Sequence, residues 1–236
     1  MYESALSFGA KMEYGEVLDI KDYGDYKEVV TAKQTYQTKY VLIATGTKER
    51  QMNLEKENEL VGRGISYCAV CDGPFFKNQE VAVIGGGNVA IDVARDSKRC
   101  ASDDTKVNMF CLESRETMPA SVEEIEEAES EGIVVNPGWG PKEVLVDENG
   151  EVRGVVLKKC LSVFDAEGRF NPTYDESELM TVECKHVFFS VGQSIVWGDL
   201  LKGSKVELGR GNGAVADELT YQTCLLYTSD AADDKA

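Results

Sequence analysis

Apolar residues follow first a strand period and then a helix period in the middle of the chain. Residues Glu80 to Ile84 include four consecutive apolar residues and predict a short parallel strand that is buried on both faces. Residues Asn88 to Lys98 place Val89, Val93 and Ala94 on one side of a predicted helix. Three glycines stand between these segments, so the pattern predicts a strand, a tight turn and a helix in succession.

Shorter apolar runs predict further strands on both sides of this unit. The expected strands cover residues 11–20, 26–33, 40–44, 106–112, 144–146, 152–158 and 186–191. Asn149-Gly150 is a strong signal for a β-hairpin. Ser121 and Glu124 have the spacing of a helix capping box. The helix that they predict, residues 121–131, carries six glutamates and is typical of a solvated surface helix rather than a binding site.

Composition limits the classes of protein to which the chain can belong. The chain has 236 residues, of which 42% are hydrophobic, enough for one large domain or two small ones. No apolar run approaches the length of about 18 residues that a membrane helix needs. The net charge of −17 argues against nucleic-acid binding, which needs clusters of lysine and arginine. The chain shows no signal peptide, so we expect a cytoplasmic protein whose thiols are kept reduced.

The turn between the predicted strand and helix is a candidate dinucleotide-binding loop. Its sequence, Gly85-Gly-Gly87-Asn88-Val89-Ala90, matches the Gly-x-Gly-x-x-Ala pattern that binds a pyrophosphate. Gly85 permits the tight turn, Gly87 lets the backbone approach the phosphates, and Ala90 lets the helix pack closely on the strand. Asn88 and Val89 begin the helix, whose amino-terminal amides attract anions. The alternative is an ordinary turn without a ligand.

Two charged residues bear on which nucleotide binds. Glu113 stands at the end of the strand expected at 106–112, where a carboxylate accepts hydrogen bonds from ribose hydroxyls and repels a 2′-phosphate. Arg115 can instead pair with that phosphate. We favour NADH because Glu113 is nearest the expected ribose position. The alternative is that Glu113 is a solvated surface charge.

A pair of cysteines precedes the glycine loop. Cys68 and Cys71 have the Cys-x-x-Cys spacing of a redox-active dithiol, in which one thiolate attacks and the other cysteine resolves the mixed disulfide. Asp72 follows directly and can exchange a proton with the leaving thiolate. Half of a zinc site is an alternative, but zinc needs four ligands and His186 is the only histidine. Two buried thiols without a role are a second alternative.

These motifs resemble two related groups of flavoproteins. Residues 5–90 resemble bacterial thioredoxin reductase through Ala44-Thr45-Gly46, Gly62-Arg-Gly64, Tyr67-Cys-Ala-Val-Cys-Asp-Gly73 and Val81-Ala-Val-Ile-Gly-Gly-Gly87. Residues 88–223 resemble glutamate synthase small-subunit-like reductases through Asn88-Val-Ala-Ile-Asp-Val-Ala-Arg95, Ser114-Arg-Glu-Thr-Met-Pro-Ala120, Pro137-Gly-Trp-Gly-Pro141 and Ser162-Val-Phe-Asp165. The second group generally lacks the cysteine pair and usually has two arginines where this chain has Leu112-Glu113.

The resemblance implies an α/β fold of the class II pyridine nucleotide-disulfide oxidoreductases. In it, a Rossmann-like three-layer NAD(P)-binding domain is inserted in an incomplete FAD-binding domain. We expect a partial FAD-binding domain at residues 1–61, an NAD(P)-binding domain at 62–193, a return to the FAD domain at 194–223, and an adapter-like artefact at 224–236. The family's FAD-binding glycine loop and closing Gly-Asp motif lie outside the chain. The simplest account of the two resemblances is a gene fragment truncated at both ends. The two parts could belong to one gene or be joined artificially at the glycine loop that both groups share, and a natural hybrid reductase is the alternative.

The resemblance also implies an activity, which is NAD(P)H:disulfide oxidoreduction through FAD, with thioredoxin as the protein partner and a homodimer as the assembly. Cys71 would face the flavin, Cys68 would exchange with the partner, and Asp72 would handle the proton. The Ala44–Gly46 segment would touch the flavin, although we expect the chain as written to purify without stoichiometric FAD. A glutamate-synthase-like electron-transfer subunit and a non-catalytic NAD(P)-binding fragment are the alternatives.

Overall fold

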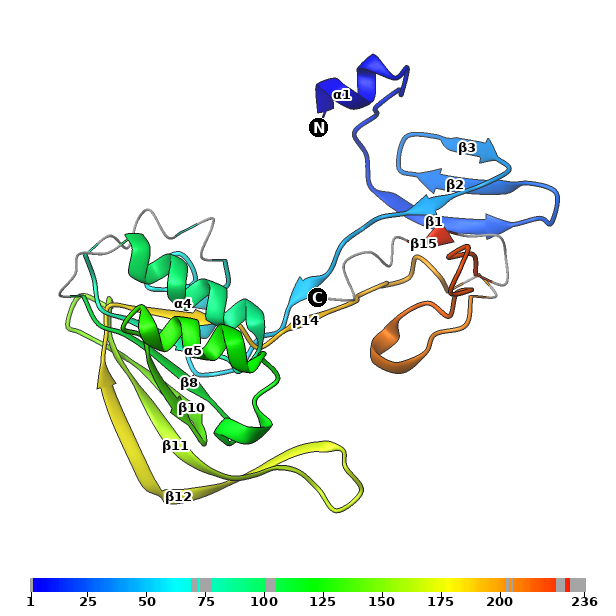
Figure 1. The fold of residues 1–236 in the computed structure, drawn as a ribbon. Helices are drawn as coiled ribbons and strands as arrows, with labels where there is room; N and C mark the ends of the chain where they lie inside the picture. Colours follow the sequence, from blue (N-terminus) through cyan, green and yellow to red (C-terminus); the bar gives the residue numbers. More distant parts are fainter. Residues whose placement is uncertain are drawn as a thin grey trace. The chain divides into compact units, whose positions relative to one another are not determined.

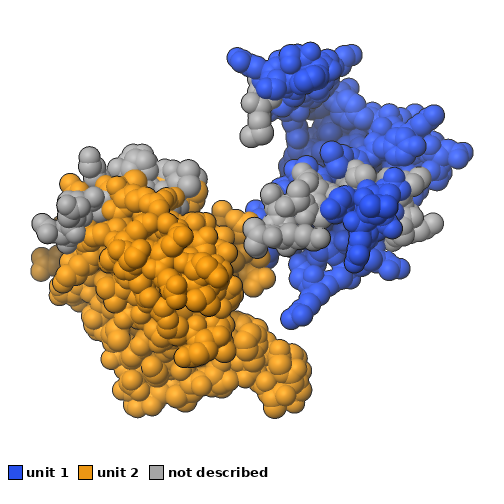
Figure 2. Space-filling view, viewed as in Figure 1, with its two compact units in different colours: residues 1–48, 194–236 blue, residues 49–193 orange. Residues whose placement is uncertain are grey.

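The computed structural model divides the chain into two compact units (Figure 1, Figure 2). Unit 1 comprises residues 1–48 and 194–236, and unit 2 comprises residues 49–193. The structure describes residues 2–68, 72, 78–100, 105–202, 204, 206–223 and 228–229. The sequence of unit 2 interrupts that of unit 1, which agrees with the expected insertion of one domain in another.

A parallel sheet of five strands forms the centre of unit 2. Its strands, in spatial order, are β6 (Ile65–Ser66), β13 (His186–Phe189), β7 (Val81–Ile84), β8 (Val107–Cys111) and β9 (Val134–Pro137). All neighbouring strands pair in parallel, so their carboxyl ends lie at one edge of the sheet. The predicted strand, turn and helix around the glycine loop are confirmed.

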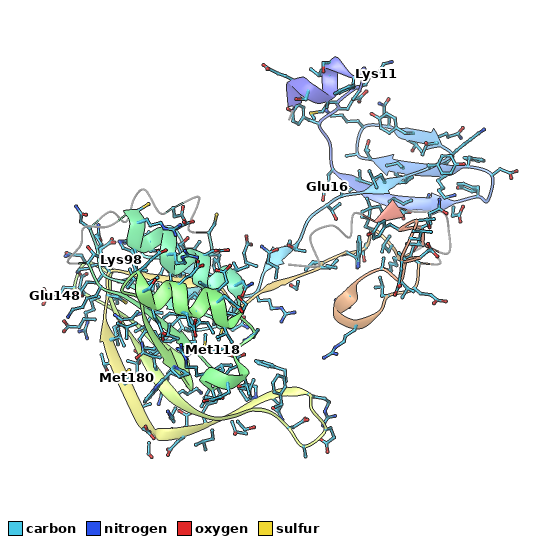
Figure 3. All side chains as sticks on the ribbon, in the orientation of Figure 1. Lys11, Glu16, Lys98, Met118, Glu148 and Met180 are labelled. Carbon is cyan, nitrogen blue, oxygen red and sulfur yellow. The ribbon has the colours of Figure 1, made fainter. Side chains whose placement is uncertain are left out.

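Different layers cover the two faces of this sheet (Figure 1). One face packs against the helices α4 (Asn88–Cys100) and α5 (Val122–Ser130). The other packs against an antiparallel sheet of β10 (Trp139–Val146), β11 (Val152–Phe164) and β12 (Phe170–Glu183). Met118 belongs to the helix-side core and Met180 packs on the core beneath the antiparallel sheet (Figure 3). The three-layer α/β fold is therefore confirmed.

Strand β7 is buried on both faces, which explains its uninterrupted apolar sequence. Val81 and Val83 pack in the helix-side core, whereas Ala82 and Ile84 pack in the core beneath the antiparallel sheet. All four side chains are at most 2% exposed. Burial of each of the larger side chains stabilises the fold by roughly 1.5–3 kcal/mol. A polar residue at any of these positions would therefore disrupt one of the two cores.

Unit 2 begins at residue 49, before the domain boundary at residue 62 that the sequence led us to expect. The short helix α2 (Glu57–Leu60) buries Leu60, which is 3% exposed, in the core beneath the antiparallel sheet. Met52 and Leu54 pack on the same core. The segment therefore belongs to unit 2, because its apolar side chains are buried there.

Unit 1 contains short elements. They are α1 (Tyr2–Ser7), an antiparallel sheet of β1 (Val17–Asp22), β2 (Lys27–Thr31) and β3 (Thr35–Thr38), the parallel pair β4 (Leu42–Ile43) and β15 (Thr228–Ser229), and the 3-10 helix η3 (Arg210–Asn212). At the junction of the units, β5 (Lys48–Glu49) and β14 (Gln193–Ser194) form a two-stranded sheet.

Two expected strands of unit 1 are shorter than predicted. The strand expected at 11–20 begins only at Val17, which pairs with Thr31, the last residue of β2, so that no partner strand extends further. The strand expected at 40–44 is reduced to β4, whose Leu42 is 66% exposed. Its partner β15 lies within residues 224–236, which the sequence led us to expect as an adapter-like artefact. Residues 228–229 nevertheless take part in a strand pair.

Other local predictions are confirmed. Helix α5 is capped by the Ser121 side chain, whose Oγ accepts a hydrogen bond from the Glu124 amide at 3.3 Å. The predicted hairpin strands at 144–146 and 152–158 lie within the longer β10 and β11. Across the described residues, no helix is both long and apolar enough to span a bilayer.

The sole histidine gives unit 2 a predictable dependence on pH. Burial lowers the pKa of His186 from 6.5 to about 4, and its Nε2 lies 2.7 Å from Gln79 Oε1. Below pH 6.5 the unfolded chain therefore binds a proton that the folded chain does not. The free energy of unfolding should fall by about 1 kcal/mol between pH 7 and 5, after allowance for partial exposure.

Urea titrations of the chain and of His186→Asn at both pH values measure this effect. The variant should lose less stability on acidification, because its residue 186 does not titrate. Equal losses in the two chains would contradict the assignment to His186.

Candidate active site

The carboxyl edge of the parallel sheet brings the predicted functional residues of unit 2 together. Cys68 follows β6, the glycine loop follows β7, and Glu113 follows β8. Ligands of open α/β sheets bind outside the carboxyl ends of the strands. Cys68 and the glycine loop therefore share the edge at which a nucleotide is expected, with β13 between the strands that they follow.

Gly85 occupies a position that only glycine fits. Its φ of 155° lies in the region that L-residues rarely adopt, and a Cβ built there would lie 2.3 Å from the Ser190 carbonyl oxygen and 3.0 Å from Ala90 Cβ. Its amide donates to the Phe110 carbonyl at 2.9 Å. The turn thus holds β13, β7 and α4 in close approach, and Ala90, which is fully buried, has the packing role that the motif predicted.

The amino terminus of α4 is suited to hold a pyrophosphate. The Gly87 carbonyl accepts hydrogen bonds from the Ala90 and Ile91 amides, and no atom lies within 4 Å of a Cβ built at Gly87. Among the residues that the structure describes, the Asn88 and Val89 amides donate no hydrogen bond. Such groups bind anions at helix termini. The loop therefore fits the phosphates of a nicotinamide dinucleotide.

The Asn88 side chain links the glycine loop to the start of α5. Asn88 Oδ1 accepts a hydrogen bond from the Ser121 amide at 2.9 Å, and the Gly86 carbonyl accepts one from the Ala120 amide at 3.0 Å. The side-chain oxygen of Asn88 is thus engaged within the protein. Its part in cofactor binding stays a prediction that concerns the backbone amide.

Glu113 and Arg115 occupy different surroundings. The half-buried Glu113 side chain bends over the glycine loop, since its Oε2 lies 2.7 Å from a Cβ built at Gly86. Arg115 begins the 3-10 helix η2 (Arg115–Thr117) and forms a two-pronged ion pair with Glu129 of α5, with one contact of 2.7 Å. This pair raises the pKa of Arg115. The carboxylate is therefore at the loop, whereas the guanidinium is engaged elsewhere.

Around Cys68, polar contacts bring together three residues. The Ser66 hydroxyl donates to Asp72 Oδ2 at 2.5 Å, and the Cys68 amide donates to Ser66 Oγ at 3.1 Å. The Asp72 amide donates to the Cys68 carbonyl at 3.1 Å. Cys68 is in a disulfide, and Cys71, its predicted partner, lies outside the described residues. The structure thus places Asp72 beside the backbone of Cys68, and the part of Asp72 in proton exchange stays a prediction.

A buried carboxylate supports the residue between Ser66 and Cys68. Glu57 is 2% exposed and accepts hydrogen bonds from the Tyr67 hydroxyl and from the Met52 and Leu54 amides, the last two at 2.9 Å. Burial, followed by the contact with Glu57, raises the pKa of Tyr67. No sequence pattern indicated a role for Glu57 or Ser66, because each is a single polar residue in a very short element, α2 and β6.

The other described cysteines are unsuited to thiolate chemistry or lie away from this edge. Burial raises the pKa of the Cys111 and Cys184 thiols to about 12 in each case, and it also raises that of Cys160. Cys100 is exposed at the end of α4. Since a thiolate is the reactive form, the buried thiols are structural.

The flavin-contacting residues predicted from the resemblance lie in unit 1. Ala44, Thr45 and Gly46 follow β4 and are exposed. The described part of unit 1 contains no strand, glycine turn and helix that would bind a second pyrophosphate. The residues present therefore do not by themselves fit FAD, and their contact with it stays a prediction.

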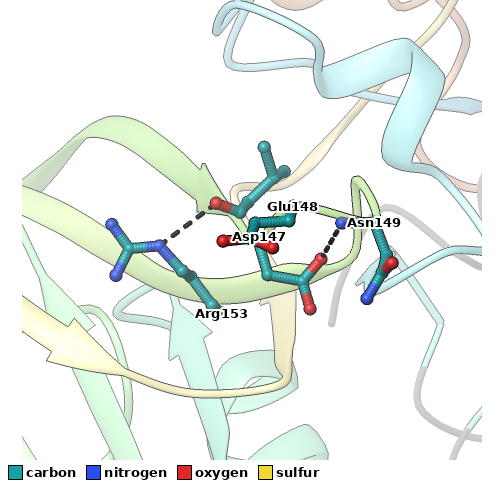
Figure 4. A pocket seen from close by; sticks show the side chains of 5 residues that line it. Asp147, Glu148, Asn149 and Arg153 are labelled. Carbon is teal, nitrogen blue, oxygen red and sulfur yellow. Dashed lines mark hydrogen bonds between the residues drawn. The ribbon is translucent and has the colours of Figure 1, made fainter.

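A shallow hollow of about 480 Å³ lies beside the turn between β10 and β11 (Figure 4). Its polar groups are engaged within the turn, where the Asn149 amide donates to Asp147 Oδ1 at 2.8 Å and Arg153 Nε donates to the Val146 carbonyl at 3.1 Å. Backbone amides lower the pKa of Asp147. These contacts stabilise the hairpin, and the hollow contains none of the predicted site residues.

A parallel sheet with a glycine loop and a helix amino terminus at its carboxyl edge defines the dinucleotide-binding class of α/β folds. The profile of the pyridine nucleotide-disulphide oxidoreductase family matches residues 4–225, and the chain belongs to that family. This confirms the superfamily that the motifs indicated.

Individual relatives are thioredoxin reductases. The enzyme of Listeria monocytogenes is 45% identical over 92 residues, which are 39% of this chain and 29% of that protein. That of Treponema pallidum is 31% identical over 213 residues, 89% of this chain and 62% of that protein. The crystal structure of Lactococcus lactis thioredoxin reductase matches 96% of this chain and 68% of its own with a TM-score of 0.78 at 28% identity. The chain thus spans less than two thirds of these two curated relatives.

Substitution of the two glycines of the loop should have different effects, one on the stability of the fold and the other on nucleotide binding. Gly85→Ala should lower the free energy of unfolding by at least about 2 kcal/mol, because its Cβ would overlap the Ser190 carbonyl. Gly87→Ala, with open space at its Cβ, should cost less than about 1 kcal/mol but weaken NADH binding. Urea unfolding and nucleotide titration measure the two effects. Equal destabilisation by both variants would contradict the geometry.

Proposed function

We propose that the whole protein, of which this chain spans a part, is an FAD-dependent NAD(P)H:disulfide oxidoreductase that acts on thioredoxin or a similar small dithiol protein. The observation that carries the proposal is the common carboxyl edge that places Cys68 and the glycine loop on one sheet. Flavin, when bound, accepts a hydride from the nicotinamide and passes two electrons to a disulfide.

This chain's own residues would bind the nucleotide and exchange thiols. The glycine loop and the α4 amides would hold the pyrophosphate. Cys68 would exchange with the disulfide of the partner, and Cys71 would form the internal bridge with it. Asp72, beside Cys68, would give a proton to the leaving thiolate.

We also propose that this chain prefers NADH to NADPH. A 2′-phosphate near the Glu113 carboxylate would meet a like charge, and Arg115 would have to leave Glu129 to neutralise it. The resemblance to glutamate synthase small-subunit-like reductases implies two arginines at this place, where the chain has Leu112-Glu113. The preference therefore rests on the charge at residue 113.

The thioredoxin reductase relatives do not favour the two alternative functions, a glutamate-synthase-like subunit and a non-catalytic nucleotide-binding fragment. The homodimer and the cytoplasmic location stay predictions. The net charge of −17 supports the expectation that nucleic acid is not a partner.

Nucleotide titration tests the preference without flavin. NADH should bind the chain at least several-fold more tightly than NADPH, because like charges a few ångströms apart cost roughly 1–3 kcal/mol. Glu113→Arg should reverse the order by placing a cation at the 2′ position. Calorimetric titration with both nucleotides measures the four affinities.

Glu116→Arg is the matched control for this substitution. It makes the same change of charge in η2, where the Glu116 carboxylate accepts a hydrogen bond from Ser114 Oγ at 2.7 Å. It should leave the preference for NADH in place. Equal or tighter binding of NADPH by the unmodified chain would show that Arg115 governs the choice.

The cysteine pair yields a prediction for mass spectrometry. After mild oxidation, a peptide spanning residues 68–71 should be lighter by two hydrogens, because two cysteines at this spacing can bring their Cα atoms to about 4.4–6.8 Å. Cys100→Ser should leave this peptide unchanged. A bridge from Cys68 to a cysteine elsewhere in the chain would count against the redox role.

A further inference from the structure

The end of β6 holds the cysteine motif through a single hydroxyl group. Ser66 pairs with Phe188 in the parallel sheet and is 1% exposed, so its position is fixed by the core. Its Oγ lies 2.5 Å from Asp72 Oδ2, 3.1 Å from the Cys68 amide and 3.3 Å from the Cys68 carbonyl. A buried side chain thus contacts the Asp72 carboxylate and the backbone of Cys68, the two residues to which the proposed exchange assigns a part.

The chemistry of a hydroxyl decides which of these contacts form together. A serine carries one hydrogen, which goes to the carboxylate, because a hydrogen bond to an ionised acceptor is shorter and about twice as strong as one to a carbonyl. The oxygen then accepts from the Cys68 amide. Ser66 therefore bridges Cys68 and Asp72, and the Asp72 amide closes the ring by donating to the Cys68 carbonyl at 3.1 Å.

This bridge leaves one carboxylate oxygen of Asp72 available. Oδ2 accepts from Ser66, whereas Oδ1 has no hydrogen-bond partner among the residues that the structure describes. Without Ser66, the half-buried Asp72 side chain would have no hydrogen-bond partner among the described residues, and its orientation would no longer be fixed. Ordering a side chain near its reacting partner is a recognised source of rate enhancement.

We propose that Ser66 is a positioning residue that orients Asp72 for proton exchange with the thiolate released from the Cys68 disulfide. The inference rests on the proposed function, in which Asp72 carries that proton. In the exchange, an incoming thiolate bonds to one sulfur, the S–S bond breaks, and its electron pair stays on the other sulfur. The Asp72 carboxylate, ionised at rest, takes the proton that the incoming thiol gives up and passes it to that sulfur.

Reduction of the Cys68 disulfide of the full chain by dithiothreitol tests this role. One thiolate of the reagent attacks, the second closes the oxidised ring, and both protein thiols are released protonated. Samples quenched with iodoacetamide at successive times and analysed by mass spectrometry give the rate at Cys68. Ser66→Ala should slow reduction at least about fivefold, and Ser66→Thr, which keeps the hydroxyl, should restore it to within about twofold.

A double-mutant cycle separates positioning from structural support. In an Asp72→Ala chain, the further change Ser66→Ala should alter the rate by less than about twofold, because Ser66 acts through Asp72. Ser97→Ala is the matched control, since it removes another buried hydroxyl, one that donates to the Val93 carbonyl at 2.7 Å in α4. It should leave the rate unchanged.

The outcomes distinguish this inference from the proposed function. If Asp72→Ala slows reduction and Ser66→Ala does not, the positioning role is wrong and the proposed function stands. The positioning role is also wrong if Ser66→Ala slows reduction equally with and without Asp72, or if Ser66→Thr fails to restore the rate. If Asp72→Ala leaves the rate unchanged, the proton role of Asp72 fails and the inference fails with it.

Discussion

Strand β7, which is buried on both faces, pairs in parallel with β13 on one side and with β8 on the other. The rest of unit 2 depends on this pairing. It places the turn at Gly85 against the Ser190 carbonyl, at a distance that no side chain at residue 85 allows. The same pairing directs the ends of β6, β7 and β8 to one edge. The packing of the core therefore brings Cys68, the glycine loop and Glu113 to a common edge.

Two buried polar side chains form hydrogen bonds with the residues around Cys68. Ser66 and Glu57 are both buried, and they contact the segment around Cys68 from the sheet and from α2. Buried polar groups need hydrogen-bond partners, so these side chains restrict the conformations open to the cysteine segment. The position of Cys68 directly after β6 is thus fixed by buried side chains.

The glycine loop of this chain has a negative charge beside it, from the Glu113 carboxylate. Glu113 lies against Gly86, while Arg115 is paired with Glu129 of α5. Family membership accordingly accounts for the loop and the sheet, and the proposed preference for NADH rests on the residues after β8.

The sequence by itself determined the strand, glycine turn and helix, the hairpin at Asn149-Gly150 and the family, because each depends on local patterns that a few neighbouring residues complete. It could not determine that residues 49–61 join unit 2, since this depends on where Met52, Leu54 and Leu60 are buried. Nor could it show that Arg115 pairs with Glu129 or that Ser66 bridges Cys68 and Asp72. The ion pair arises only when η2 packs near α5, and the Ser66 bridge depends on the path that the chain takes after β6 and on the burial of Ser66 in the sheet, so the tertiary structure alone decided them.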